Sequence, residues 1–144
     1  MGLTVVDASV AVKWTLEEAD SAAAAQLLEI GDTLLAPELL LVEGVGAITR
    51  ALRQGRLSLA HVERALDTWT AGLERGAVEL VPNSVDLRRA ANLSCQLSHA
   101  VADCLYLALA ERLDARLVTA DVTFARRAST GYGAICLLSD LDNG

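Results

Sequence analysis

The stretch VADCLYLALAERLDARLVTAD, residues 101–121, decides the fold class. Residues 101–113 are rich in Ala and Leu, which favour a helix, and Asp103 stands near their start among apolar side chains. Leu117–Thr119 is a short apolar run typical of a buried strand, and Asp121 follows after one intervening residue. A helix that leads directly into such a strand indicates an α/β protein with a parallel sheet.

The rest of the chain repeats this alternation. Strands are predicted at Leu3–Val6, Thr33–Ala36, Val78–Val81, Leu117–Thr119 and Ala134–Leu138. Helices are predicted at 9–17, 19–30, 37–53, 58–76, 84–97, 101–113 and 121–129, and the last residues are expected to be frayed. Ser9, Ser58 and Ser84 are expected to cap the helices that they begin, and Pro37 to be the first residue of its helix. The sequence therefore predicts one α/β domain over residues 1–144, with a parallel sheet of four to five strands covered on both faces.

The composition limits the class of protein and its partners. Hydrophobic residues make up 53% of the 144 residues but aromatic ones only 3%, so Ala, Leu and Val must build the core. The net charge is −7, from 19 acidic and 12 basic residues, which excludes a broad basic face that coats nucleic acid. Any contact with nucleic acid is therefore expected to be local and assisted by a metal ion.

The cysteines and the lengths of the apolar runs indicate the cellular compartment of the protein. Cys95, Cys104 and Cys136 are odd in number, widely spaced and set among apolar residues, which predicts reduced core cysteines. The N-terminal residues carry no basic segment followed by a signal-length apolar run, and no apolar stretch reaches the length of a membrane span. We expect a cytoplasmic protein without a membrane segment.

Four acids stand where an acid is costly. Asp103 lies in an apolar helix, Glu43 lies in LLLVEGVGAI, and Asp7 and Asp121 follow strands. Each has an ordinary alternative: a helix cap for Asp7 and Asp121, a helix-dipole position for Asp103, and an exposed side chain or a salt bridge to Arg50 for Glu43. Ligands of open α/β sheets bind beyond the carboxyl ends of the strands, so we expect the four acids to cluster there.

Four crowded carboxylates repel one another unless a cation lies between them. An all-oxygen site favours a hard cation, so Mg²⁺ or Mn²⁺ is predicted; His61 and His99 are isolated in sequence and are expected on the surface or in the core. One or two such ions activate water for attack on a phosphodiester. The sequence contains no GxxxxGK[ST], GxGxxG or GxSxG motif, which excludes the functions built on those motifs.

Four segments carry a family resemblance: VVDASVAVKW (5–14), APELLLVEGVGAI (36–48), ADCLYLALAERL (102–113) and LVTADVTFAR (117–126). In order and spacing they resemble the PIN-domain family, specifically the VapC-type ribonuclease toxins of bacterial and archaeal toxin–antitoxin pairs. The resemblance implies a three-layer α/β/α sandwich. It also implies a metal-holding acidic quartet with two polar supporting residues beside it: Asp7, Glu43, Asp103 and Asp121, with Ser9 and Thr119. Two positions depart from the family pattern, which often has Asn at position 46 and an aromatic residue at position 102; here they are Gly46 and Ala102.

By this resemblance the chain is expected to be a metal-dependent endoribonuclease and the toxin of a toxin–antitoxin pair. The expected partners are an RNA substrate, a cognate antitoxin and a second copy of the chain in a homodimer. Five basic residues lie nearest in sequence to the acid motifs: Lys13, Arg50, Arg53, Arg126 and Arg127. Some of them are candidates for phosphate contacts, but for each one a position on a solvated helix face is the favoured interpretation.

Other functions remain open. The chain could be a PIN-like nuclease of RNA or DNA processing outside toxin–antitoxin systems, or a PIN-like binding module without catalysis. A phosphatase with a strand-end Asp nucleophile is disfavoured because Asp7 is followed by Ala-Ser, without the second acid of that motif. A receiver-type phosphoacceptor module is disfavoured because no lysine follows Leu117–Thr119.

Overall fold

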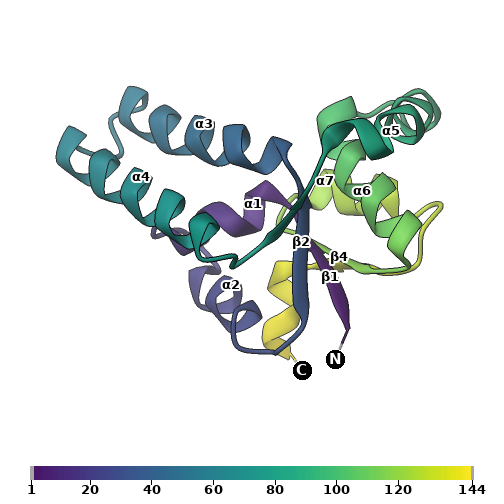
Figure 1. Ribbon diagram of the computed structural model, residues 1–144, viewed down its shortest axis with the longest axis horizontal. Coiled ribbons are helices and arrows are strands. Elements are labelled where there is room, and N and C mark those ends of the chain that lie inside the picture. Colours follow the sequence, from purple (N-terminus) through teal and green to yellow (C-terminus); the bar gives the residue numbers. More distant parts are fainter. Residues whose placement is uncertain (1, 144) are drawn as a thin grey trace.

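A parallel sheet forms the centre of the molecule. The computed structural model describes residues 2–143, and within that range five strands pair in the order β3-β2-β1-β4-β5, all parallel (Figure 1). Their bounds are β1 Leu3–Val6, β2 Thr33–Pro37, β3 Glu79–Val81, β4 Arg116–Thr119 and β5 Ile135–Leu137. The prediction of a parallel sheet of four to five strands is confirmed.

The order of the strands creates a crevice beside β1. The chain runs outward from β1 to β2 and β3, and then crosses back to β4 and β5 on the other side of β1. Val5 accordingly pairs with Leu35 of β2 and with Leu117 of β4. Connections leave β1 and β4 in opposite directions at this switch point, so the carboxyl ends of these two strands border the expected ligand crevice.

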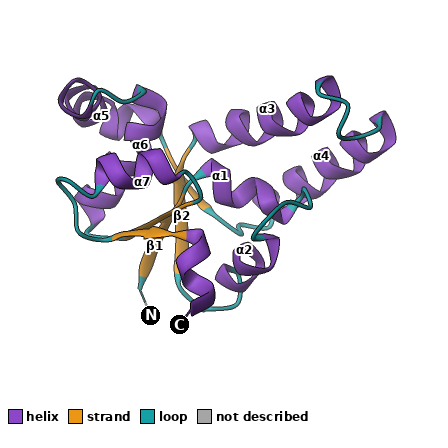
Figure 2. Cartoon of the chain, turned by 180° about the vertical axis from the view of Figure 1, so that it is seen from behind, coloured by secondary structure: helices purple, strands orange, loops and turns teal. Residues whose placement is uncertain are grey.

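Helices cover both faces of the sheet. Their bounds are α1 Ala8–Ala11, α2 Ser21–Leu27, α3 Leu39–Arg53, α4 Leu59–Glu74, α5 Asn83–Leu97, α6 Val101–Leu113 and α7 Val122–Ala128, with 3₁₀ turns η1 Val12–Trp14 and η2 Leu138–Asn143. Figures 1 and 2 show α5, α6 and α7 on one side of the sheet, and α1, α2 and the projecting α3–α4 pair on the other. The predicted α/β/α sandwich is confirmed.

Helix α6 explains the apolar stretch around Asp103. Residues 104–110 are all buried, because this helix packs against β1, β2 and β4. A helix buried on every side is apolar on every side. Asp103 lies in the first turn of α6, the end of the helix at the carboxyl edge of the sheet.

A glycine allows α3 and α4 to pack closely. A Cβ atom at Gly44 would lie 2.1 Å from the Trp69 ring of α4, a distance at which neither helix could keep its place. At Gly46, two residues further along α3, an added Cβ would have no atom within 4 Å. Gly44 is therefore required by the packing of the two helices, whereas Gly46 leaves open space.

Several predicted boundaries are wrong. Ser9 does not cap a helix, because α1 begins at Ala8 and the Ser9 hydroxyl has partners described below. Pro37 ends β2, where it pairs with Val81, and does not begin α3. Ser84 lies inside α5, which begins one residue earlier. Ser58 does cap α4, accepting a hydrogen bond from the His61 N–H.

The regions nearest the termini also differ from prediction. The helix expected at 9–17 is a short α1 followed by η1, and the one expected at 19–30 covers only Ser21–Leu27. The last described residues form the turn η2 and not a frayed end; Gly144 lies outside the described residues.

The cysteines are free, as expected, but not all are in the core. Cys104 is buried and Cys136 is partly buried, whereas Cys95 is exposed on α5. Within the described residues no single helix is long and apolar enough to cross a membrane. Only α5 and α6 together, bent by 116° at their junction, pass that test by length and composition.

Candidate active site

The four acids predicted from the sequence line one cleft. Asp7 follows β1, Asp121 follows β4, Glu43 lies on α3 and Asp103 lies on α6. The cleft has a volume of about 270 Å³, and its lining is Asp7, Ala8, Ser9, Val12, Glu43, Gly46, Ala47, Arg50, Asp103 and Asp121. Residues from four separate segments thus meet at the carboxyl edge of the sheet, beside the switch point between β1 and β4.

Asp7 lies at the bottom of this site and is held by two hydroxyl groups. The Ser9 hydroxyl donates to its Oδ2 at 2.6 Å, and the Thr119 hydroxyl donates to the same oxygen at 2.8 Å. Each hydroxyl in turn accepts a backbone N–H, from Ala120 and from Asp121 respectively. Since each hydroxyl has one proton, both protons point at Asp7. Its other oxygen, Oδ1, accepts no hydrogen bond from the described residues.

The burial of Asp7 raises its pKa. Only 5% of the residue is exposed, and no cationic side chain of the described residues lies within 4 Å of its carboxylate. The Asp7 pKa is raised from 3.8 to about 6: burial is the main cause, the charges of Asp103 and Glu43 add to it, and the two hydroxyl bonds oppose it. Near neutral pH the site therefore contains a buried anionic carboxylate without a cationic partner.

Glu43 is positioned by a tyrosine from the opposite side of the sheet. The Tyr106 hydroxyl donates to Glu43 Oε1 at 2.6 Å. Burial, together with the charge of Asp103, raises the pKa of Glu43, while the tyrosine bond lowers it. The pKa of Tyr106 is raised, chiefly by its own burial, so the phenol stays protonated and remains a donor. The salt bridge between Glu43 and Arg50 considered above is not formed.

Asp103 is the end of a relay of hydrogen bonds that the sequence did not predict. Arg127 Nη1 lies 3.1 Å from Nδ1 of His99, and a guanidinium has only donors, so Nδ1 accepts. With Nδ1 accepting, the ring proton lies on Nε2, which donates to Asp103 Oδ2 at 2.6 Å. The ring also stacks on Phe124, with centroids 5.0 Å apart. The expectation that His99 is a mere surface or core residue is therefore wrong.

Asp121 has two roles in the local structure. As predicted, it caps a helix: its Oδ1 accepts the N–H of Phe124 at the start of α7. It is also exposed at the mouth of the cleft. One ligand atom each from His99, Asp103 and Asp121 lie within 4.8 Å of one another, a spacing at which they could hold an ion.

The side chains present fit a divalent cation. Both ring nitrogens of His99 are hydrogen-bonded, so the donors left for an ion are carboxylate oxygens, a set that suits Mg²⁺ or Mn²⁺. Such an ion would compensate the buried charge of Asp7, bind its free Oδ1 atom and reduce the repulsion between the acids.

His99 and Tyr106 are site residues that sequence reasoning missed, and Arg127, named above as a candidate for phosphate contacts, instead contacts His99. The one available signal for His99 was its position four residues before Asp103, and on a short connection between helices that spacing predicts no contact. The contact of Tyr106 with Glu43 joins residues 63 positions apart and had no local signal.

The fold resembles several solved structures. One is PAE2754 from Pyrobaculum aerophilum, with a TM-score of 0.69 and 20% identity, covering 99% of this chain and 91% of that one. Another is a toxin–antitoxin complex from Klebsiella pneumoniae, with a TM-score of 0.58 and 14% identity over 94% and 97% of the two chains. A third is VapBC2 from Rickettsia felis bound to a DNA fragment from their promoter, with a TM-score of 0.60 and 15% identity over 94% and 96%. At these identities the likeness establishes the fold.

The family is established by sequence. No curated protein sequence matches the chain. The family profile described as "PIN domain" matches residues 4–129, which is most of the chain and includes all four acids of the cleft. Together with the acid cleft at the switch point of a parallel sheet, this match shows that the chain belongs to the PIN domain family.

Proposed function

We propose that this PIN domain protein is a metal-dependent endoribonuclease. The observation that carries the proposal is the state of Asp7: a buried carboxylate with no cationic partner, in a cleft that three further acids share. Structural acids in a protein interior are normally paired with a cation of the chain. A buried acid without such a partner, among further acids, is the environment that a metal-dependent phosphodiesterase requires.

Asp7, Glu43, Asp103 and Asp121 would hold one or two Mg²⁺ or Mn²⁺ ions. When bound, such an ion polarises the scissile phosphate and supplies a water of lowered pKa as the nucleophile. The chain's own residues orient the acids: Ser9 and Thr119 hold Asp7 Oδ2 and leave Oδ1 toward the cleft.

Other side chains fix the remaining acids. Tyr106 holds Glu43, and His99, backed by Arg127, holds Asp103. These contacts reduce the freedom of the acids before any ligand binds, which lowers the cost of assembling the site.

We further propose that the protein is the toxin of a toxin–antitoxin pair. Two of the similar structures are a toxin–antitoxin complex and a VapBC complex on promoter DNA. The proposal includes a cognate antitoxin, a homodimeric assembly and a cytoplasmic location. Expression of the chain alone should stop growth. Co-expression with the small product of a neighbouring gene should restore growth, and that product should co-purify with the chain. Cleavage without toxicity or a co-purifying partner would indicate instead a PIN nuclease of RNA or DNA processing.

The nuclease activity is tested by incubating purified protein with a mixed RNA pool in Mg²⁺, in Mn²⁺ and in EDTA. Cutting should require the metal and should disappear in Asp103→Asn. Asp86→Asn is the matched control, because it removes one carboxylate from a helix outside the cleft. Cutting by Asp103→Asn at the wild-type rate, or cutting in EDTA, would refute the mechanism. No cutting by folded, partner-free protein would favour a PIN-like binding module.

A further inference from the structure

A second groove continues from the acid cleft. This groove has a volume of about 340 Å³ and shares Ser9, Val12, Ala47, Arg50 and Asp121 with the cleft. Because the two depressions have these walls in common, they form one continuous channel on the surface. Arg50 already lines the cleft, and the groove adds Lys13 and Arg56, so three cations line the channel beside the acids. We call these three residues the cation track.

The cation track is built from segments next to the acids. Arg50 lies seven residues after Glu43 on α3, so both project from one face of that helix. Lys13 lies on η1, directly after the helix that follows Asp7. Arg56 lies in the connection between α3 and α4, where its Nε donates to Gln54.

None of the three cations is neutralised by the chain. Among the side chains that the structure describes, no carboxylate oxygen lies within 4 Å of Lys13, Arg50 or Arg56. By contrast, Arg89, Arg112 and Arg116 are paired with Glu111, Asp86 and Asp32. Glu18 and Asp121 also line the groove, but neither forms an ion pair with the track. In a chain of net charge −7, the gathering of three unpaired cations in one groove beside an acid cleft favours binding of an external anion there.

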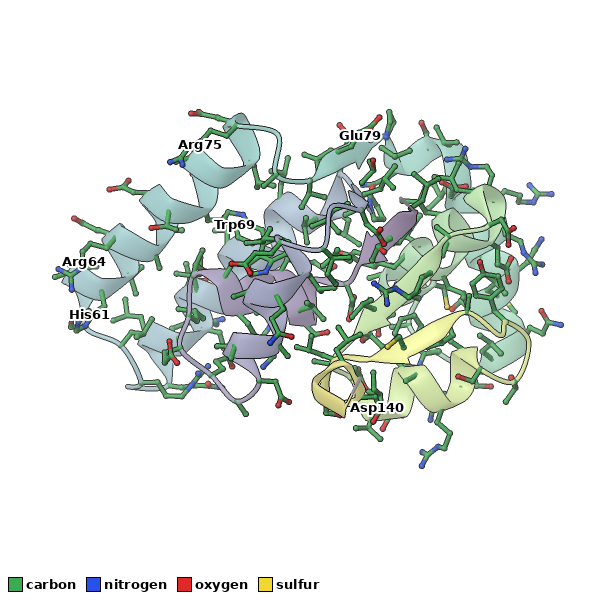
Figure 3. The ribbon with its side chains drawn as sticks, turned by 90° about the horizontal axis from the view of Figure 1, so that it is seen from below. His61, Arg64, Trp69, Arg75, Glu79 and Asp140 are labelled. Atoms are coloured by element: carbon green, nitrogen blue, oxygen red, sulfur yellow. The ribbon has the colours of Figure 1, made fainter. Side chains whose placement is uncertain are left out.

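The positive surface extends past Arg56. A third depression of about 550 Å³ shares Leu16 and Arg56 with the groove and is lined also by Arg64 and His61, with one acid, Glu17. Figure 3 shows His61 and Arg64 side by side at one end of α4. Apart from His61, no aromatic side chain of the described residues lines the three depressions, so a ligand would be held there by charge and not by stacking.

We propose that the cation track binds the backbone of a single-stranded RNA on one side of the bond to be cut. This inference rests on the proposed nuclease function and names the path of its substrate. The scissile phosphate would lie at the four acids, and the following phosphates would contact Arg50, Lys13 and Arg56. A narrow positive groove that follows a flexible backbone is the usual form of a single-strand site. Because these contacts are to phosphates, they select for a strand without selecting its sequence.

The test measures RNA binding separately from cleavage. All proteins carry Asp103→Asn, and the affinity for a fluorescein-labelled single-stranded RNA is measured by anisotropy in Mg²⁺ buffer over a range of salt. The variant Lys13→Gln/Arg50→Gln/Arg56→Gln is compared with Arg53→Gln/Arg75→Gln/Arg88→Gln. Both remove three positive charges, and the control residues are exposed outside the channel. Arg53 is a strict control, since it lies on the same helix as Arg50.

We expect the track variant to bind at least about tenfold more weakly at moderate salt and to lower the salt slope of log K by about 2, since each phosphate contact contributes about 0.7 for single strands. The control variant should keep most of the wild-type slope. Equal slopes for the two variants would show an effect of net charge alone and would overturn the proposal. An unchanged slope in the track variant would also overturn it, and would make an acidic peptide the better candidate for the groove.

Two further arrangements keep the test decisive. The single substitutions Lys13→Gln, Arg50→Gln and Arg56→Gln should each lower the slope by about 0.7 if the triple variant does not fold. Cleavage by the protein with Asp103 restored separates the two proposals. If the protein cleaves RNA but the track and control variants have the same salt slope, the cation track is overturned and the nuclease proposal stands. If the slopes differ but no RNA is cleaved, the nuclease proposal is overturned and the binding track stands.

Discussion

Asp7 and Asp86 are equally buried, with 5% of each residue exposed, but their surroundings are opposite. Asp86, in the first turn of α5, accepts two hydrogen bonds from Arg112 of α6, at 2.7 Å and 3.1 Å. Asp7 accepts only the hydroxyls of Ser9 and Thr119, and its charged neighbours are other acids.

The difference separates an acid that is paired within the fold from one that we propose binds a cation. The Asp86–Arg112 pair joins two helices, and its charges cancel within the chain. At Asp7 the chain supplies geometry without charge compensation, and this is the condition for binding a cation. Burial alone does not mark a functional acid; burial without a cationic partner does.

The largest expected effect is on cleavage. Asp7→Asn should lower the RNA cleavage rate on the order of a thousandfold, because it removes a charge on which the proposed metal site depends. Asp86→Asn should change the rate by no more than about threefold, because Asp86 is outside the cleft. Initial rates at a fixed Mg²⁺ concentration measure both. Equal losses in the two variants would remove the functional distinction between the two aspartates.

The second effect is on stability: replacing Asp7 is expected to stabilise the protein, whereas most substitutions of buried residues destabilise it. The native pKa of Asp7, about 6, lies above the ordinary 3.8, so the native state binds the proton more tightly and stability falls as pH rises through this range. Asn carries no charge, so metal-free Asp7→Asn should gain up to about 3 kcal/mol in free energy of unfolding above pH 7.

Urea titrations in EDTA at pH 5 and pH 8 test this prediction. The advantage of Asp7→Asn over wild type should grow by about 1.4 kcal/mol between the two pH values. An advantage that is absent, or that is the same at both pH values, would mean that Asp7 is compensated in a way that the hydrogen bonds do not reveal.

The third effect is the opposite one at Asp86. Asp86→Asn should lower the free energy of unfolding by about 2 kcal/mol, because it weakens a charged, two-bond contact between α5 and α6. Arg112 is 41% exposed at its side chain, so it can be rehydrated, and this limits the loss. A double-mutant cycle with Arg112→Gln isolates the pair. A coupling energy near zero would show that the two helices do not depend on it.

The smallest effect concerns the relay behind Asp103. His99→Ala should weaken Mn²⁺ binding about tenfold, since it removes the donor that orients a proposed ligand. His99→Gln should recover part of the affinity, because its amide N–H can donate from a similar position. His61→Ala is the matched control: among the described residues the His61 ring is hydrogen-bonded only to Ser58, the cap of α4, and it lies outside the acid cleft. Isothermal titration measures the affinities; wild-type binding by His99→Ala would exclude the relay.

The sequence determined the strands and the acids that follow them. Runs such as Leu117–Thr119 are too apolar and too short for anything but buried strands, and strand ends in a parallel sheet share one edge. That physical rule alone brings Asp7 and Asp121 to one place. The apolar run 104–110 likewise predicts a helix that is buried on all sides, and Asp103 lies in the first turn of that helix.

The tertiary structure decided which partners each acid has. Ser98, in the left-handed conformation at φ 52°, turns the chain between α5 and α6 where His99 meets Asp103. The contacts of Tyr106 with Glu43 and of Arg112 with Asp86 join distant residues, as does the channel between η1 and α3. Sequence periodicity reports burial and local hydrogen bonding, whereas charge compensation depends on which side chains of separate segments meet in space. Only the folded chain shows that Asp86 has its arginine and that Asp7 has none.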